Sequence, residues 1–285
     1  MQSDGYKIVQ LANGTYSIHS VAERETFHPV IGPVAEAEAL YVKQLRLCGR
    51  LERHAGEFVI WDVGLGAAAN VLTLLRSTKE ISSKIRIVSF DHKIEPLQFA
   101  ASHAENLGYF SGYEKNVQDF VERGNVTFVN GRQNVDWEFH LGDFPTLLAE
   151  TVSVKKFPAP HAILFDAFSP AKNPAMWTLP LFTKLFNSLD PLRPCAMPTY
   201  SRATMLRVTL LLAGFFVGVG HATGEKEETT IAANAMNLID EPLPKKWLER
   251  VRNSKSAEPM HDPFYQQRFI SPDSWERLVK HPQFR

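Results

Sequence analysis

One stretch of the chain, residues 58–75, constrains its fold more than any other. It begins with an apolar, strand-forming run that contains Asp62, continues through Gly64 and Gly66, and then becomes rich in helix-forming residues. A strand, a glycine turn and a helix in this order are typical of the first unit of a nucleotide-binding α/β sheet. Glycines let the backbone turn tightly and let a ligand come close, which a Cβ would block. The stretch therefore predicts a cofactor loop, with an ordinary βα turn as the alternative.

The turn differs from the full dinucleotide-binding fingerprint. Ala68 stands where the third glycine would be, and the acid Asp62 lies inside the motif. The resulting pattern, acid-x-Gly-x-Gly, favours S-adenosylmethionine as the ligand, because this molecule has no pyrophosphate to place at a helix N-terminus.

Composition limits the class of protein. The chain has 285 residues, 44% hydrophobic and 22% charged, which is enough for a sizeable core. Basic and acidic residues are equal at 31 each, so any nucleic-acid binding would need a local basic patch. Two cysteines, Cys48 and Cys195, give no disulfide framework. No signal peptide is apparent, and the longest apolar run, 208–220, is too short to span a bilayer. We expect a cytoplasmic protein without a membrane partner.

We expect three parts along the chain. Residues 1–50 should form a hairpin around Asn13-Gly14 and an amphipathic helix over 34–47, packed on the core. Residues 51–240 should form the main α/β domain. Residues 241–285 form a C-terminal extension whose aromatic content predicts packing on the domain, with short helices near 245–252 and 274–280.

Three further acids lie at the ends of predicted elements, where a cofactor could be bound. Asp91 ends a predicted strand over 85–90, where the acid of a nucleotide site would hold the ribose hydroxyls; a helix N-cap is the alternative. Asp143 follows a strand over 135–141 and either accepts the adenine amino group or caps a turn. Glu36 lies near the start of the 34–47 helix, as a ligand or as a solvated first-turn acid.

A second informative stretch, residues 166–177, follows the predicted buried strand 161–165. It carries an acid, Asp166, with Phe168, Lys172 and Trp177 in a loop stiffened by prolines. Ligands of open α/β sheets bind at the carboxyl ends of the strands, and core packing does not require this combination of residues. We therefore expect the loop to belong to the functional site.

The rest of the chain supplies the remaining elements of the sheet. Residues 108–134 predict an insertion with some structure of its own, because they are too long for a normal αβ loop. Helices are expected over 176–189 and 201–213. Strands are expected over 195–200, 215–220 and 229–233, with the last two paired across 224–228.

These motifs together resemble those of a known family. Residues 166–177 are similar to the signature Asp-Gly-Phe-Ala-Pro-x-Lys-Asn-Pro-x-Met-Trp of the tRNA wobble-uridine methyltransferases, which make 5-methylaminomethyl-2-thiouridine. The family's turn, Glu-x-Gly-Phe-Gly-Thr-Gly-x-Asn, aligns on Asp62 to Asn70, and Gly142-Asp143 also has a counterpart. The resemblance covers roughly residues 15–235. This chain departs from it at Asp62, Ala68 and Ala167, where the family has Glu, Gly and Gly.

The resemblance implies a class I S-adenosylmethionine-dependent methyltransferase fold, a Rossmann-like α/β sheet with an N-terminal β-hairpin and a C-terminal extension. It implies seven strands, the last antiparallel, S-adenosyl-L-methionine as cofactor, and the tRNA anticodon loop as partner, with no metal. In many bacteria the family's methyltransferase is fused to a flavin-dependent oxidase. A second glycine fingerprint is absent from the sequence. We therefore expect the stand-alone form, with a separate enzyme supplying the aminomethyl uridine.

The resemblance also implies roles. Asp166 would be catalytic, either accepting the proton of the attacking amine or holding the amine by a charge-assisted hydrogen bond. The expected cofactor-binding residues are Asp62, Gly64, Gly66, Asn70, Asp91, Asp143 and Glu36, and the expected substrate-binding residues are Phe168, Lys172 and Trp177.

Several of these roles have alternatives. Phe168 and Trp177 would stack on the flipped base, although Trp177 at a helix start also fits the core. Lys172 would contact a phosphate or lock the loop through Asp166, and Lys226 in the final hairpin lies near the family's basic residues. Two other functions stay open: an aminopropyltransferase-like polyamine enzyme, against which Lys172 and Asn173 argue, and an inert Rossmann-like binding module.

Overall fold

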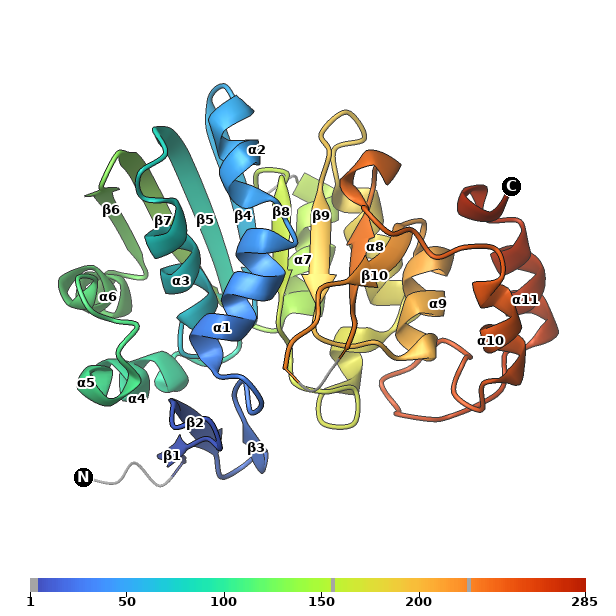
Figure 1. The fold of residues 1–285 in the computed structure, drawn as a ribbon, viewed down its shortest axis with the longest axis horizontal. Coiled ribbons are helices and arrows are strands. Elements are labelled where there is room, and N and C mark those ends of the chain that lie inside the picture. Colours follow the sequence, from blue (N-terminus) through green and yellow to red (C-terminus); the bar gives the residue numbers. More distant parts are fainter. Residues whose placement is uncertain (1–4, 155–156, 225–226) are drawn as a thin grey trace.

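A computed structural model describes residues 5–154, 157–224 and 227–285 (Figure 1). Lys226, which the resemblance places near the family's basic residues, lies outside the described residues. An eight-stranded sheet runs through the molecule. Its strands, in spatial order, are β10 (Phe216–Gly220), β11 (Thr229–Ala233), β9 (Ala196–Thr199), β8 (Ala162–Phe165), β4 (Glu57–Val63), β5 (Ser83–Asp91), β7 (Gln133–Leu141) and β6 (Asn125–Asn130).

The strand directions confirm the predicted fold class. Strand β4 pairs in parallel with β5 on one side and β8 on the other, and β5 pairs in parallel with β7. Strand β11, the last in the chain, is antiparallel to both β9 and β10. The predicted number of strands is wrong, because β6 adds an eighth strand antiparallel to β7.

Helices cover both faces of the sheet (Figure 1). The strand β4 shows why, since its alternate side chains belong to two separate cores. Phe58 and Ile60 join one hydrophobic cluster, and Val59, Trp61 and Val63 join the other. A strand that is buried on both faces needs a continuous apolar run rather than alternation, as the sequence of β4 has.

The first core lies under the earlier helices and the second under the later ones. The helices of the first set are α1 (Pro33–Ala37), the π-helix η1 (Glu38–Lys43), α2 (Leu47–Arg53), α3 (Ala69–Thr78), α4 (Glu95–Ser102), α5 (Ala104–Leu107) and α6 (Glu114–Arg123). Those of the second set are α7 (Phe144–Val154), the 3-10 helix η2 (Pro174–Trp177), α8 (Leu179–Ser188), α9 (Thr204–Ala213), α10 (Trp247–Asn253) and α11 (Pro272–Val279). Two further 3-10 turns are η3 (Met236–Leu238) and η4 (Pro282–Phe284).

The N-terminal part contains the predicted hairpin but not a single amphipathic helix. Strands β1 (Tyr6–Gln10) and β2 (Tyr16–Ser20) pair antiparallel, and β3 (Glu25–Thr26) adds to β2. The expected 34–47 helix is instead divided into α1, the π-helix η1 and the start of α2. Arg46 breaks the run with a left-handed backbone, φ +49°. Hydrophobic periodicity carries no sign of such a break, because all three pieces face the same core.

The expected insertion over 108–134 is a helix followed by a strand. Helix α6 places Phe120 on Trp137 of β7, with ring centroids 4.0 Å apart. Strand β6 then returns along β7, and its Val129 is 71% exposed, as suits an edge strand. The segment therefore extends the sheet and does not form a separate unit.

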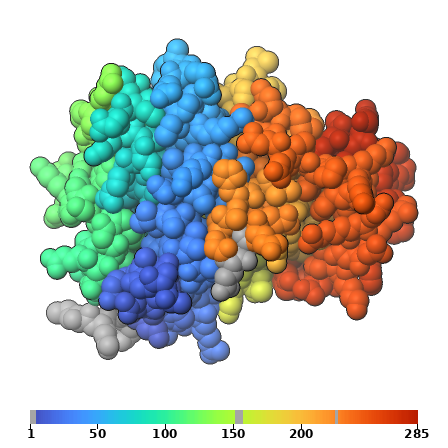
Figure 2. Space-filling model, viewed as in Figure 1, coloured from blue at the N-terminus to red at the C-terminus, as the bar shows by residue number. Residues whose placement is uncertain are grey.

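The C-terminal extension has the two predicted helices, α10 and α11, which pack on the second core and form one end of the molecule (Figure 2). Trp247 and Phe284 are buried, whereas Phe264 and Tyr265 are exposed, so only part of the aromatic content of the extension packs on the domain. Among the described residues, no helix has both the length and the apolar character needed to cross a bilayer.

Candidate functional site

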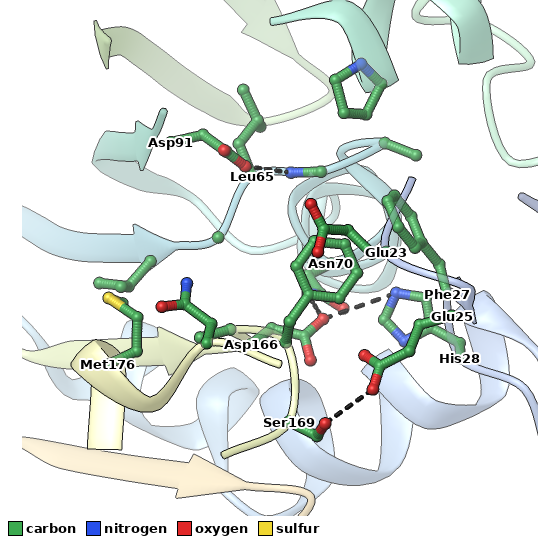
Figure 3. Close-up of a pocket in the computed structure, with 18 of the residues that line it drawn as sticks. Glu23, Glu25, Phe27, His28, Leu65, Asn70, Asp91, Asp166, Ser169 and Met176 are labelled. Atoms are coloured by element: carbon green, nitrogen blue, oxygen red, sulfur yellow. Dashed lines mark hydrogen bonds and ion pairs between the residues drawn. The ribbon is translucent and has the colours of Figure 1, made fainter. Parts of the chain in front are cut away.

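The main pocket lies at the carboxyl ends of the central strands, where the strand order changes direction between β8, β4 and β5. Its volume is about 480 Å³, within the range of small-molecule sites. The N-terminal segment that carries β3 and the loop after it covers one wall. Residues from segments far apart in sequence therefore meet here (Figure 3).

The glycine turn after β4 forms the floor of the pocket. Gly64, Gly66 and Ala68 all have left-handed backbones, with φ of +96°, +49° and +57°. A Cβ on Gly64 would lie 2.7 Å from the carbonyl oxygen of Asp166, so glycine is required there by both conformation and space. Ala68 stands where the family has its third glycine and has the same left-handed backbone. For a residue with a Cβ this conformation costs about 1–2 kcal/mol, whereas glycine adopts it without strain.

Asp91 lies across the turn, at the end of β5. Its Oδ2 accepts a hydrogen bond from the Gly66 N–H at 3.0 Å, and its Oδ1 accepts one from the Lys93 N–H at 3.2 Å (Figure 3). The carboxylate is nearly buried and lines the pocket. Its position is compatible with the predicted ribose contact, which stays a prediction.

Two other predicted cofactor acids lie differently. Asp143 is exposed at the pocket rim, and its Oδ2 accepts hydrogen bonds from the N–H and Oγ1 of Thr146. It therefore caps α7 and faces the pocket at the same time. Asp62 does not line the pocket, because its side chain is buried between strands and accepts a hydrogen bond from Ser89 at 2.7 Å. Burial raises the pKa of Asp62 to about 7. The side chain of Asp62 therefore lies beneath the pocket wall, and its predicted contact with the cofactor stays a prediction.

Asp166 follows β8 directly and lies among three other polar side chains. Its Oδ2 accepts a hydrogen bond from Nδ2 of Asn70 at 2.8 Å and lies 3.6 Å from Nε2 of His28 (Figure 3). Nδ1 of His28 lies 3.9 Å from Oε1 of Glu36. We call these four residues the Asp166 cluster. Asn70 thus contacts Asp166 rather than standing alone in the turn.

Charge in this cluster favours a protonated histidine. Burial alone would lower the pKa of His28, but the negative charges of Asp166 and Glu36 outweigh it and raise the pKa to about 9. Glu36 is buried, so its alternative as a solvated first-turn acid is wrong. At neutral pH the cluster is a cation between two carboxylates.

The same side chains offer a group of metal-ligating atoms. One atom each from His28, Glu36 and Asp166 lie within 4.8 Å of one another. A protonated imidazole has no free lone pair for a metal, which favours the ion-pair interpretation at neutral pH. The absence of a metal from the mechanism stays a prediction.

Of the three predicted substrate-binding residues, only Phe168 lines the pocket. The Phe168 ring packs edge-on against the Phe27 ring, with the ring centroids 5.6 Å apart. Lys172 is exposed and is not part of the pocket wall. Trp177 is fully buried, and its Nε1 donates a hydrogen bond to the carbonyl of Phe168 at 2.8 Å. Trp177 therefore holds the loop in shape and has no exposed face for a base, as its core alternative implies.

Sequence reasoning missed the residues that the N-terminal segment brings to the pocket. His28, with φ +47°, and Phe27 line it, and Glu25 accepts a hydrogen bond from Ser169 of the Asp166 loop at 2.7 Å. These residues lie more than 130 positions before Asp166 in the chain. The available signal was that the family resemblance extends over roughly residues 15–235, which gives no physical reason for a contact between His28 and Asp166.

Comparison with known proteins agrees with this geometry. Residues 113–235 match a family model described as S-adenosyl-L-methionine-dependent methyltransferase. A bifunctional tRNA 5-methylaminomethyl-2-thiouridine biosynthesis protein, MnmC, of Campylobacter concisus is 26% identical over 220 residues, which cover 76% of this chain and 34% of that protein. The MnmC protein of Methylibium petroleiphilum is 27% identical over 244 residues, covering 82% and 35%. The chain thus spans about a third of the length of these relatives.

The fold has a counterpart among solved structures. The crystal structure of MNMC2 from Aquifex aeolicus superimposes with a TM-score of 0.71 at 21% identity, over 98% of this chain and 84% of that one. The predicted fold class is therefore confirmed. The names of the matched relatives agree with the resemblance drawn from the 166–177 loop and the glycine turn.

Proposed function

We propose that this chain, an S-adenosyl-L-methionine-dependent methyltransferase, methylates the aminomethyl nitrogen of a wobble uridine in tRNA. The observation that carries the proposal is the Asp166 cluster, which places a fixed carboxylate at the end of β8 in the pocket. The matched relatives are named for 5-methylaminomethyl-2-thiouridine biosynthesis in tRNA, which supports this substrate class. Part of the proposal is that a separate enzyme supplies the aminomethyl uridine.

The residues present fit the methyl donor. The glycine turn leaves a cradle that a Cβ on Gly64 or Gly66 would narrow, since the latter would lie 3.4 Å from the Phe27 ring. Asp91 presents a nearly buried carboxylate suited to two hydroxyl groups, and Asp143 stands at the rim. When bound, S-adenosyl-L-methionine supplies a methyl group already activated by its sulfonium. The Asp91 side of the pocket would hold the nucleoside part of the cofactor.

The task left to the protein is to position the amine and remove its proton. A primary amine is mostly protonated at neutral pH and cannot attack in that form. In the proposal, the Asp166 carboxylate receives the ammonium group by a charge-assisted hydrogen bond and accepts its proton, which frees the nitrogen lone pair for attack. Asn70 and protonated His28 hold the carboxylate in place, and Phe168 offers an aromatic face to the base.

The decisive experiment follows the methyl group. The protein is incubated with labelled S-adenosyl-L-methionine and bulk tRNA that lacks wobble methylation, and the RNA is digested to nucleosides. The proposal expects the label in a methylaminomethyl uridine at the wobble position. Label in another nucleoside, or none in RNA, contradicts it.

Isothermal titration separates the remaining alternatives. Binding of S-adenosyl-L-methionine is expected. Binding of only its decarboxylated analogue would point to aminopropyl transfer, and no binding of either would point to an inert module. Both of those results would overturn the proposed reaction.

A further inference from the structure

The connection between α10 and α11 exposes aromatic side chains that the proposed reaction does not use. Every residue from 261 to 269 is exposed, and we call this segment the aromatic loop. Phe264, Tyr265 and Phe269 are 69%, 42% and 58% exposed, with two glutamines and Arg268 between them. Large apolar side chains grouped on a surface mark an interaction site more often than chance.

The backbone of the aromatic loop is fixed at its base. The N–H groups of Ala257 and Glu258 both donate to the carbonyl of Arg268, at 2.9 and 3.1 Å. The Glu258 carboxylate accepts hydrogen bonds from the Ser271 N–H at 2.7 Å and from the Ser274 hydroxyl at 2.9 Å. The aromatic rings are therefore presented to solvent by a closed, hydrogen-bonded loop.

The aromatic loop begins beside the loop that carries Asp166. The Leu179 N–H donates to the Met260 carbonyl at 2.8 Å, and Met260 forms a β-bridge with Thr178. Thr178 directly follows Trp177, the last residue of the 166–177 loop. Figure 1 shows the α10–α11 connection at the same edge of the sheet as β1–β3 and the Asp166 loop, low in the view. The start of the aromatic loop is thus joined by hydrogen bonds to the residues that directly follow the Asp166 loop.

The chemistry of this surface suits single-stranded RNA. Unpaired bases stack on aromatic rings and on arginine, and amide side chains read their edges. The extension is also basic, with nine Lys and Arg against six Asp and Glu over residues 241–285, whereas the rest of the chain has 22 against 25. An extension with an excess of positive charge that also carries exposed rings is complementary to a phosphate backbone.

We infer that the aromatic loop docks unpaired nucleotides of the tRNA anticodon loop that neighbour the base in the pocket. The inference rests on the proposed function and names the part of the RNA that this chain holds outside the reaction site. It assigns the C-terminal extension to substrate recognition.

The test is direct binding of RNA to the full chain, without turnover. A fluorescently labelled anticodon stem-loop RNA and a blunt duplex of the same stem are titrated with wild type and with a Phe264→Ala, Tyr265→Ala, Phe269→Ala variant. The matched control is Leu192→Ala, which removes a side chain that is 90% exposed in the connection leading to β9. Affinity for S-adenosyl-L-methionine, the unfolding midpoint and the oligomeric state are measured for all three proteins.

Removal of a ring on which one base stacks lowers RNA affinity by about ten-fold or more. We therefore expect the triple variant to bind the stem-loop at least ten-fold more weakly than wild type. Affinities for the duplex and for the cofactor should stay within two-fold of wild type, and the unfolding midpoint within a few degrees. Leu192→Ala should resemble wild type in all of these measurements. An unchanged stem-loop affinity overturns the inference. An equal loss on the duplex also overturns it, and so does a change in oligomeric state, which would indicate a protein partner for the loop.

The outcome can be separated from that of the proposed reaction. Loop-dependent RNA binding without methyl transfer to tRNA would remove the proposed reaction and keep the docking surface. Methyl transfer with loop-independent binding would remove only the docking surface.

Discussion

The two sides of the pocket use carboxylates in different ways. On one side the Asp166 cluster links Asp166 and Glu36 through a shared histidine, and all of its members are largely buried. On the other side Asp91 accepts hydrogen bonds from the backbone N–H groups of Gly66 in the glycine turn and of Lys93. Asp143 accepts one from the Thr146 N–H and is exposed. Acids that share a partner should respond to mutation as one unit, whereas acids with separate partners should respond independently.

The largest effect is expected from Asp166→Ala. Loss of a general base or an orienting carboxylate costs about 10²–10⁴-fold in rate, so turnover on tRNA should fall by that factor. Cofactor affinity should stay within a few-fold, because the Asp91 side is intact. Single-turnover kinetics and calorimetry check the two expectations. Asp166→Asn, which keeps the size but not the charge, should be similarly slow, and a variant that retains most of its rate removes Asp166 from the mechanism.

Gly64 joins the two sides, and Gly64→Ala should disturb both. The new Cβ would lie 2.7 Å from a backbone oxygen at φ +96°, so we expect a loss of about 2–5 kcal/mol in unfolding free energy. Gly56→Ala is the matched control, since Gly56 has the same φ with nothing within 4 Å. It should cost only about 1–2 kcal/mol. Equal losses in urea denaturation would show that the contact with Asp166 does not matter.

The coupling through His28 should appear in the pH dependence of stability. Its folded pKa of about 9 lies above the value of 6.5 for an ordinary histidine, so the protonated ring stabilises the fold. This contribution, roughly 3 kcal/mol, is fully present below pH 6.5 and is lost as the pH rises through 9. The unfolding free energy of wild type should therefore fall towards that of His28→Gln between pH 7 and pH 10. His221→Gln, at an exposed histidine, should follow wild type, and parallel curves for His28→Gln would contradict the ion-pair interpretation.

On the other side, Asp91→Asn should weaken S-adenosyl-L-methionine binding by about 10–100-fold, the cost of a charged hydrogen bond. The change leaves the Asp166 cluster untouched. Calorimetric titration measures the loss, and affinity within two-fold of wild type would exclude the predicted ribose contact.

The smallest effect is expected from Asp143→Asn. Asparagine caps a helix as well as aspartate does, so α7 should keep its stability. Because the carboxylate is exposed, cofactor affinity should weaken by less than about five-fold. The Asp91→Asn, Asp143→Asn double variant should show the sum of the two free energies, whereas His28→Gln with Asp166→Ala should not. If the losses of binding free energy at Asp91 and Asp143 were not additive, the acids on this side of the pocket would be coupled, and the two sides would not differ in this respect.

The local sequence correctly predicted the functional residues that directly follow a parallel strand. The glycine turn, Asp91, Asp143 and Asp166 were all placed correctly at the carboxyl ends of strands, because parallel strands bring those ends to one edge. The two helices of the C-terminal extension also lie close to the predicted ranges 245–252 and 274–280. The break in the 34–47 segment could not be found this way, since α1, η1 and α2 share one buried face.

The sequence alone determined which side chains stand at the strand ends, because that depends only on the order of elements along the chain. Only the tertiary structure decided what each carboxylate contacts. It placed His28 between Glu36 and Asp166, turned Asp62 into the sheet and buried Trp177 under its own loop. These outcomes depend on packing between distant segments, whose distances and burial are not encoded in any local pattern.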